Sequence, residues 1–221
     1  MKKINKKALD FLSEIAENNN REWFAINKQR YLDIKKDIEL FWAHLYSELN
    51  DFDESLQNIN SGPYMFRIYH DARFAKGRPY KQNYGILIAD WWKPSMHNRA
   101  GYFLNIEPWN SFIVWGAYMP DPDWLKNMRN NIIENPDEIK NILNDSKFSE
   151  IFKLEWKKLK TAPRWFAKDH PEIDLLRYKS IYAIHYFTDK EVLDTKFFDK
   201  LVWICKILYP FDQYLNKLVK K

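Results

Sequence analysis

The sequence Ala100-Gly-Tyr-Phe-Leu-Asn-Ile-Glu-Pro-Trp-Asn-Ser-Phe-Ile-Val-Trp-Gly-Ala-Tyr118 contains two strand-like runs joined by a short turn. The runs Ala100–Glu107 and Ser111–Tyr118 are rich in aromatic and branched residues, which favour β-strands. Between them, Pro108-Trp109-Asn110 has the length and composition of a turn. Because the connection is so short, the two strands are predicted to be antiparallel neighbours.

Two earlier segments extend this pattern. Tyr64–Asp71 alternates with period two, so that Arg67, Tyr69 and Asp71 share one face. Tyr84–Ala89 is a second strand, and Asp90–Arg99 is predicted to be a long hairpin tip. The four strands together predict an antiparallel meander, to which Ser180–Phe187 adds a candidate last strand.

Helical patterns lie on both sides of these strands. Asn5–Glu17 is one helix, and Asn20 is the predicted N-cap of a longer one that ends near Asn50. Start signals and apolar spacing predict the later helices at 122–134, 136–143, 147–152, 169–178 and about 195–220, with a capping box at 188–191. The expected fold is α+β: one domain over residues 1–221, with N-terminal helices, a central antiparallel sheet and a helical C-terminal half.

The composition limits the class of protein. Of the 221 residues, 46% are hydrophobic and 17% aromatic, which excludes a disordered chain. The net charge of +5 permits nucleic acid or anionic ligands without requiring them. The single cysteine, Cys205, lies on an apolar helix face and is predicted to be a small core residue. With no signal peptide and no apolar run long enough for a membrane span, we expect a cytoplasmic protein.

The segment Phe66–Lys81, which we call the basic arm, concentrates charge and aromatic rings. It begins as a strand and ends as a loop. Within sixteen residues it carries six charged side chains interleaved with four aromatic ones: Arg67, Asp71, Arg73, Lys76, Arg78 and Lys81 with Phe66, Tyr69, Phe74 and Tyr80. This arrangement makes the basic arm the first place to look for a binding site.

Four ordered blocks of the chain resemble the DUF2461 family of conserved hypothetical proteins. They are Asn18–Phe24; Phe66–Phe74 with Pro79–Lys81; Gly101–Pro108 with Met119-Pro120; and Leu159–Arg164 with Asp169–Pro171 and Arg177–Ser180. The resemblance covers about residues 8 to 215 and implies a single α+β domain of bacterial, cytoplasmic type, with no established activity. His70, Trp109 and Trp115 depart from the family pattern, in which His70 is usually Arg and the two tryptophans are usually small residues.

The charged residues suggest a site for an anion. Arginine binds carboxylate and phosphate through paired hydrogen bonds, so arginines beside aromatic rings suit an anionic ligand. The predicted ligand-binding residues are Arg67, Arg73, Lys81, Arg164 and Lys179. Asp71 and Glu107 would orient these bases, or act as acid–base groups if the protein is an enzyme. Equally open is a purely structural role, in which Arg67–Glu107 or Arg73–Asp71 is a buried ion pair that fixes the fold.

Two other functions stay open. Asp71 and Glu107 would hold a divalent ion in a metal-assisted phosphodiesterase or nuclease, but the lysine expected after Glu107 is missing and Lys81 or Lys179 would have to replace it. A non-catalytic nucleic-acid or protein-interaction module would instead use a basic face with exposed tryptophans such as Trp109 or the pair 91–92. The sequence identifies no cofactor and no reaction. Zinc is not expected, because the histidines show no paired spacing.

Overall fold

The structure, a computed structural model, describes residues 2–56, 64–71, 73, 75–88, 101–117, 120–154 and 157–218. The chain clusters into two compact units. Unit 1 comprises Met1–Ile88, Phe103–Ile113 and Tyr186–Trp203, and unit 2 comprises Ala89–Tyr102, Val114–His185 and Ile204–Lys221. The count of one domain stays a prediction.

The α+β class is confirmed. An antiparallel sheet has six strands in the order β1-β2-β3-β4-β6-β5, so the predicted meander of four strands is present. The strands are β1 Tyr64–Met65, β2 Tyr84–Ile88, β3 Gly101–Ile106, β4 Ser111–Ala117, β5 Lys153–Leu154 and β6 Ile181–Phe187. The predicted hairpin tip at 90–99 lies outside the described residues.

Two predicted elements are shorter than expected. The strand over Tyr64–Asp71 was wrong beyond Met65, where β1 ends. The helix over 169–178 was also wrong in length, since α6 covers only Ile173–Leu176. Its end has a clear cause: Lys158 and Tyr178 form an antiparallel bridge, and the Lys179 N–H donates to the Lys157 carbonyl at 2.8 Å, so this backbone is extended.

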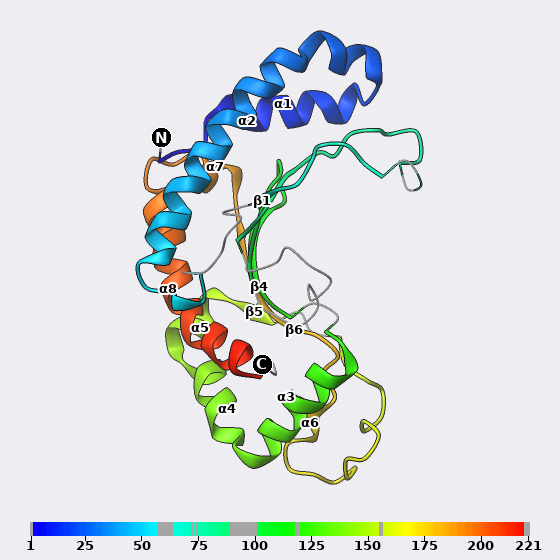
Figure 1. Ribbon diagram of the computed structural model, residues 1–221, viewed down its shortest axis with the longest axis vertical. Coiled ribbons are helices and arrows are strands. Elements are labelled where there is room, and N and C mark those ends of the chain that lie inside the picture. Colours follow the sequence, from blue (N-terminus) through cyan, green and yellow to red (C-terminus); the bar gives the residue numbers. More distant parts are fainter. Residues whose placement is uncertain are drawn as a thin grey trace. The chain divides into compact units, whose positions relative to one another are not determined.

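Unit 1 begins with two helices joined by three asparagines, α1 Lys6–Glu17 and α2 Arg21–Asn50 (Figure 1). Asn20 caps α2 as predicted, because its side chain accepts a hydrogen bond from the Trp23 N–H at 2.8 Å. A short 3-10 turn, η1 Glu54–Leu56, follows α2. Phe41 of α2 packs against Phe197 and Phe198 at the start of α8 Phe197–Lys217, with ring centroids 6.2 and 5.5 Å apart.

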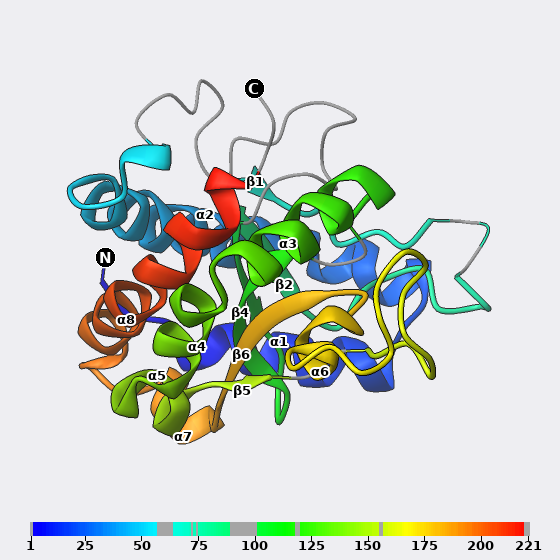
Figure 2. The ribbon, with the colours of Figure 1, turned by 90° about the horizontal axis from the view of Figure 1, so that it is seen from below.

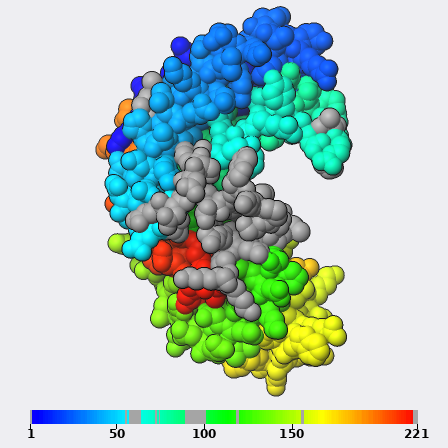
Figure 3. All heavy atoms as spheres, viewed as in Figure 1, coloured from blue at the N-terminus to red at the C-terminus, as the bar shows by residue number. Residues whose placement is uncertain are grey.

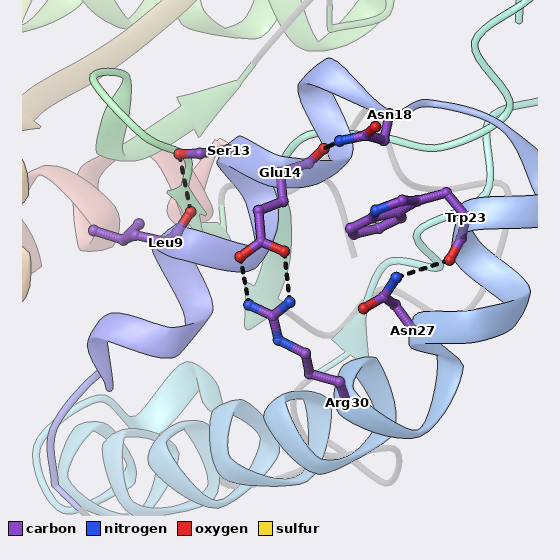
Figure 4. Close-up of polar contacts among 7 residues, drawn as sticks. All are labelled: Leu9, Ser13, Glu14, Asn18, Trp23, Asn27 and Arg30. Atoms are coloured by element: carbon purple, nitrogen blue, oxygen red, sulfur yellow. Dashed lines mark hydrogen bonds and ion pairs between the residues drawn. The ribbon is translucent and has the colours of Figure 1, made fainter.

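A bidentate ion pair also joins α1 and α2 (Figure 4). Arg30 donates to both carboxylate oxygens of Glu14, at 2.5 and 2.6 Å. These hydrogen bonds lower the pKa of Glu14. Because both side chains are partly exposed, the pair fixes the geometry of the two helices more than it adds stability.

Unit 2 contains the helices α3 Pro122–Glu134, α4 Pro136–Asn144 and α5 Ser146–Ile151, which follow one another through tight turns (Figure 2). Its core is aromatic: Tyr102 packs on Trp115 with centroids 3.8 Å apart, and Phe148 packs on Phe211 at 5.5 Å. Cys205 is fully buried, as predicted for a core residue. No helix in the described part of the chain is long and apolar enough to cross a membrane.

The predicted capping box at α7 Asp189–Val192 is present and gives a pH prediction. Burial acts to raise the pKa of Glu191, but hydrogen bonds from Lys200 and Thr188 outweigh it and lower the pKa to about 2. A carboxyl with a depressed pKa stabilises the fold fully above its unfolded pKa of 4.5, and this stability is lost as pH falls towards 2.

We therefore expect acid unfolding curves to separate the native chain from Glu191→Gln. Between pH 5 and pH 2 the native free energy of unfolding should fall by about 1–2 kcal/mol more than that of the variant, a value reduced for the partial exposure of the carboxylate. Urea titrations at several pH values measure this difference. Parallel pH profiles would contradict it.

Candidate functional site

The basic arm is a hairpin that continues beyond the sheet. Tyr69 and Tyr80 form an antiparallel bridge, and the His70 N–H donates to the Pro79 carbonyl at 2.8 Å. Its turn is closed by the Arg78 N–H, which donates to the Ala75 carbonyl at 2.7 Å. Both central residues of this turn, which lies within the loop between His70 and Pro79, have positive φ, 43° at Lys76 and 79° at Gly77, as in a type I′ turn.

The start of α2 holds this arm in place. The Asn19 side chain donates to the Tyr80 carbonyl at 2.8 Å and accepts from the Tyr80 N–H at 3.0 Å. Phe24 stacks on Tyr80 with centroids 4.1 Å apart and meets Tyr69 edge-on at 5.8 Å. In the space-filling view the teal residues of the arm lie against the blue helices (Figure 3). Sequence analysis assigned Asn20 to capping and missed the role of Asn19.

Arg67 lies where the strand ladder is interrupted. Tyr64 pairs with Leu87, and Tyr69 pairs with Tyr80. The segment 64–69 therefore advances by five residues while the opposite segment, 80–87, advances by seven. The two extra residues form a bulge, which bends a strand and redirects its side chains. This break is the physical reason why the predicted strand ends early. Arg67 is exposed and, within the described residues, has no hydrogen-bond or ion-pair partner.

Arg67 lines a groove of about 290 Å³, which we call the α2 groove. One wall comes from α2 and the other from residues 64–69. The described lining contains three basic side chains and no acidic one: Lys28, Lys35 and Arg67, with Phe24, Tyr31, Leu32, Tyr64, Met65, Ile68 and Tyr69. Lys28 and Lys35 were not predicted as site residues, although they stand seven residues apart, on one face of the helix.

Lys81 lies within the electrostatic influence of Arg67. Burial, and then the positive charge of Arg67, lower the pKa of Lys81. The Lys81 ammonium lies 5.5 Å from the centroid of the Phe66 ring. No carboxylate among the described residues pairs with Lys81. Two positive charges therefore act on each other here, and the nearest acid that the Arg67 charge affects is Asp71, whose carboxylate is hydrogen-bonded to Arg73.

Asp71 and Arg73 form one of the ion pairs considered from the sequence. The Arg73 guanidinium donates to both Asp71 oxygens, at 3.0 and 2.7 Å, and these hydrogen bonds lower the pKa of Asp71. The pair is not buried, since the Arg73 side chain is 78% exposed. The role of Arg73 as a ligand-binding residue stays a prediction.

Glu107 takes part in the turn between β3 and β4. Its Oε2 accepts from the side-chain amides of Asn105 and Asn110, at 3.0 and 2.9 Å. Asn105 is buried and also accepts from Asn83 at 2.5 Å. Among the described residues, no three or more His, Cys, Asp or Glu side chains gather closely enough to hold a metal ion.

Arg164 and Lys179 both belong to unit 2 and both are exposed. The Arg164 guanidinium lies over the Trp165 ring, 4.7 Å from its centroid. A site that combines them with the basic arm stays a prediction.

A larger groove of about 730 Å³ lies on another side of Tyr69, and Arg21, Glu22, His70 and Tyr80 contribute to its lining. Burial raises the pKa of Tyr80, while the charges of Arg21 and Glu22 act on it in opposite directions. Because arginine and glutamate stand side by side here, this groove has no clear preference for anions.

A comparison with models of known protein families gives a match over most of the chain. The family model described as "Conserved hypothetical protein (DUF2461)" matches residues 7–214. Neither the curated proteins nor the solved structures gave a match to the chain.

Proposed function

Since the chain belongs to the DUF2461 family of conserved hypothetical proteins, we propose its function from its own residues: unit 1 binds an anionic small molecule in the α2 groove. The ligand would carry a phosphate or carboxylate group. Arg67 is its main contact, with Lys28 and Lys35 on the helix wall.

The single observation that carries the proposal is the unpaired Arg67. A guanidinium presents five N–H donors in a rigid fork, which matches the oxygens of carboxylate and phosphate. Arg67 is exposed and lines the groove with Lys28 and Lys35. Lys35 is paired with Glu39 at 2.9 Å, and the Arg67 charge lowers the pKa of Asp71, but Arg67 itself has no ion-pair partner among the described residues. Gathering like charges costs free energy, which an anion in the groove would recover.

The remaining walls of the groove indicate the rest of the ligand. Phe24, Tyr31, Tyr64 and Tyr69 contribute aromatic surface, and Tyr69 is 46% exposed. Ligand pockets combine apolar walls with a few polar groups that fix orientation. An anion attached to a flat or apolar body therefore suits this groove better than inorganic phosphate alone. Arg164 and Lys179 are not needed for this proposal.

Titration with phenyl phosphate tests the proposal. We expect saturable binding by calorimetry, with Arg67→Ala about tenfold to a hundredfold weaker, because hydrogen bonds to charged groups contribute about 1.5–3 kcal/mol. Arg67→Lys should restore part of the affinity, as a point charge without the fork. Inorganic phosphate should bind more weakly than phenyl phosphate.

Arg78→Ala is the matched control, because Arg78 is an exposed arginine in the turn of the same arm and does not line the groove. Its affinity for phenyl phosphate should equal that of the native chain. If Arg67→Ala and Arg78→Ala lost the same affinity for phenyl phosphate, the binding would depend only on general surface charge. That result would refute the assignment of the ligand to this groove.

A further inference from the structure

Residues 157–179 of unit 2 carry most of the excess positive charge of the protein. Seven basic and three acidic residues fall in this segment, a net charge of +4, against +5 for the whole chain. The basic ones are Lys157, Lys158, Lys160, Arg164, Lys168, Arg177 and Lys179. All except Arg177 are exposed. We call this segment the basic loop.

The basic loop holds a tryptophan in a conformation that folding does not explain. The Phe166 N–H donates to the Pro163 carbonyl at 3.2 Å and closes a turn. Trp165, the third residue of that turn, has φ +75°, a region that favours glycine. Its side chain is 85% exposed, so no burial of the indole compensates for the backbone strain.

The surroundings of Trp165 are cationic and well fixed. Arg164 lies on the indole ring at 4.7 Å. Arg177 donates to the carbonyls of Leu159 and Lys160, at 2.8 and 3.1 Å, and so holds the lysine-rich backbone beside residues 177–179. The acidic partners are few: Asp174 lies 4.0 Å from the Lys158 ammonium. Trp165 is therefore an exposed ring in contact with Arg164, in the same loop as the exposed lysines 157, 158 and 160.

We propose that the basic loop binds single-stranded nucleic acid. An unpaired base stacks on Trp165, and Arg164 with Lys157, Lys158 and Lys160 binds the phosphates that follow. Proteins that bind single strands without sequence preference combine these two elements, aromatic platforms and a positive track. A duplex fits less well, because its bases are stacked on each other and cannot reach the ring.

Fluorescence anisotropy with a fluorescein-labelled 20-nucleotide oligo(U) and the full chain tests the proposal. Trp165→Gly should weaken binding at least about fivefold, since stacking on one aromatic side chain contributes about 1–3 kcal/mol per base. Glycine relieves the positive φ, so the variant should be as stable as the native chain or more stable. A loss of affinity therefore cannot be attributed to unfolding.

Trp109→Gly is the matched control. Trp109 is 89% exposed with φ +66°, and the Asn110 N–H closes its turn on the Glu107 carbonyl at 3.1 Å. Its neighbours are acidic, since its own N–H donates to Asp189 at 2.9 Å. This variant should bind oligo(U) as the native chain does.

The salt dependence tests the phosphate contacts. Replacing Lys157, Lys158 and Lys160 together with glutamine should reduce the slope of log K against log salt by about 2, because each phosphate contact on a single strand contributes about 0.7. Three results would overturn the proposal: no binding of oligo(U) at low salt, native affinity in Trp165→Gly, or equally tight binding of a blunt duplex. The two proposals fail separately, because phenyl phosphate binding is followed in Arg67→Ala and oligo(U) binding in Trp165→Gly.

Discussion

Gly116→Ala is expected to destabilise the protein by more than about 4 kcal/mol, at the upper end of what one substitution does. A Cβ built on Gly116 would lie 2.2 Å from the Ile181 carbonyl oxygen and 2.5 Å from the Tyr182 Cα. Both atoms are backbone of the neighbouring strand β6, so they cannot move aside as a flexible side chain does. The φ of +139° adds strain for any side chain.

Gly77→Ala separates the effect of the close backbone contact from the effect of the positive φ. Gly77 also has a positive φ, +79°, but nothing lies within 4 Å of a Cβ placed there. This variant should lose only about 1 kcal/mol, the cost of the backbone conformation. Urea unfolding followed by circular dichroism measures both. If the two variants were equally stable, the close approach of β4 and β6 at Gly116 would be wrong.

The second large effect is expected for Phe24→Ala, with a loss of about 3–5 kcal/mol. Phe24 is 3% exposed and contacts three tyrosine rings, Tyr31, Tyr69 and Tyr80, with centroids 5.4, 5.8 and 4.1 Å away. Its removal leaves a cavity between α2 and the basic arm. It also removes part of the wall of the α2 groove.

Two measurements distinguish a loss of packing at the basic arm from a general loss of stability. Amide hydrogen exchange should increase most at His70 and Lys81, whose N–H groups donate to the Pro79 and Ile68 carbonyls across the arm, because the arm loses its packing partner. Ile26→Ala, on the same helix but 84% exposed, should change stability by no more than about 0.5 kcal/mol. Unchanged exchange in the arm of Phe24→Ala would show that the ring does not hold it.

Local signals explain what the sequence could predict of the fold. Capping depends on residues three positions apart, so Asn20 with Trp23, and Thr188 with Glu191, were identified without knowledge of tertiary structure. The β3–β4 hairpin was also predicted, since its turn is only a few residues long. Such elements depend on their own sequence.

The predictions were wrong where residues distant in the sequence determine the end of a strand or helix. Alternation continues through Tyr64–Asp71 because any extended chain alternates, but the ladder is broken by extra residues on the partner strand, near Gln82. Likewise α6 is short because Tyr178 pairs with Lys158. Neither partner is visible in the pattern of the segment itself.

The site residues stay a prediction, and the sequence and the structure contribute differently to it. Composition alone marked the basic arm, and the structure places Arg67 and Lys81 within each other's influence. The α2 groove needed the tertiary fold, because Lys28 and Lys35 come from a helix in which sequence analysis identified no site residue. Trp165 was missed as well: neither Pro163-Arg164 before it nor Phe166 after it signals a left-handed backbone, for which glycine or asparagine would be the usual sign.

The three consecutive asparagines between α1 and α2 each fix a different backbone. Asn18 donates to the Glu14 carbonyl at the end of α1, Asn19 holds Tyr80, and Asn20 caps α2. Connections of this kind usually tolerate insertions and deletions. Here a change of one residue in length would misalign three attachments at once, so the spacing of this linker is as tightly constrained as that of a buried element.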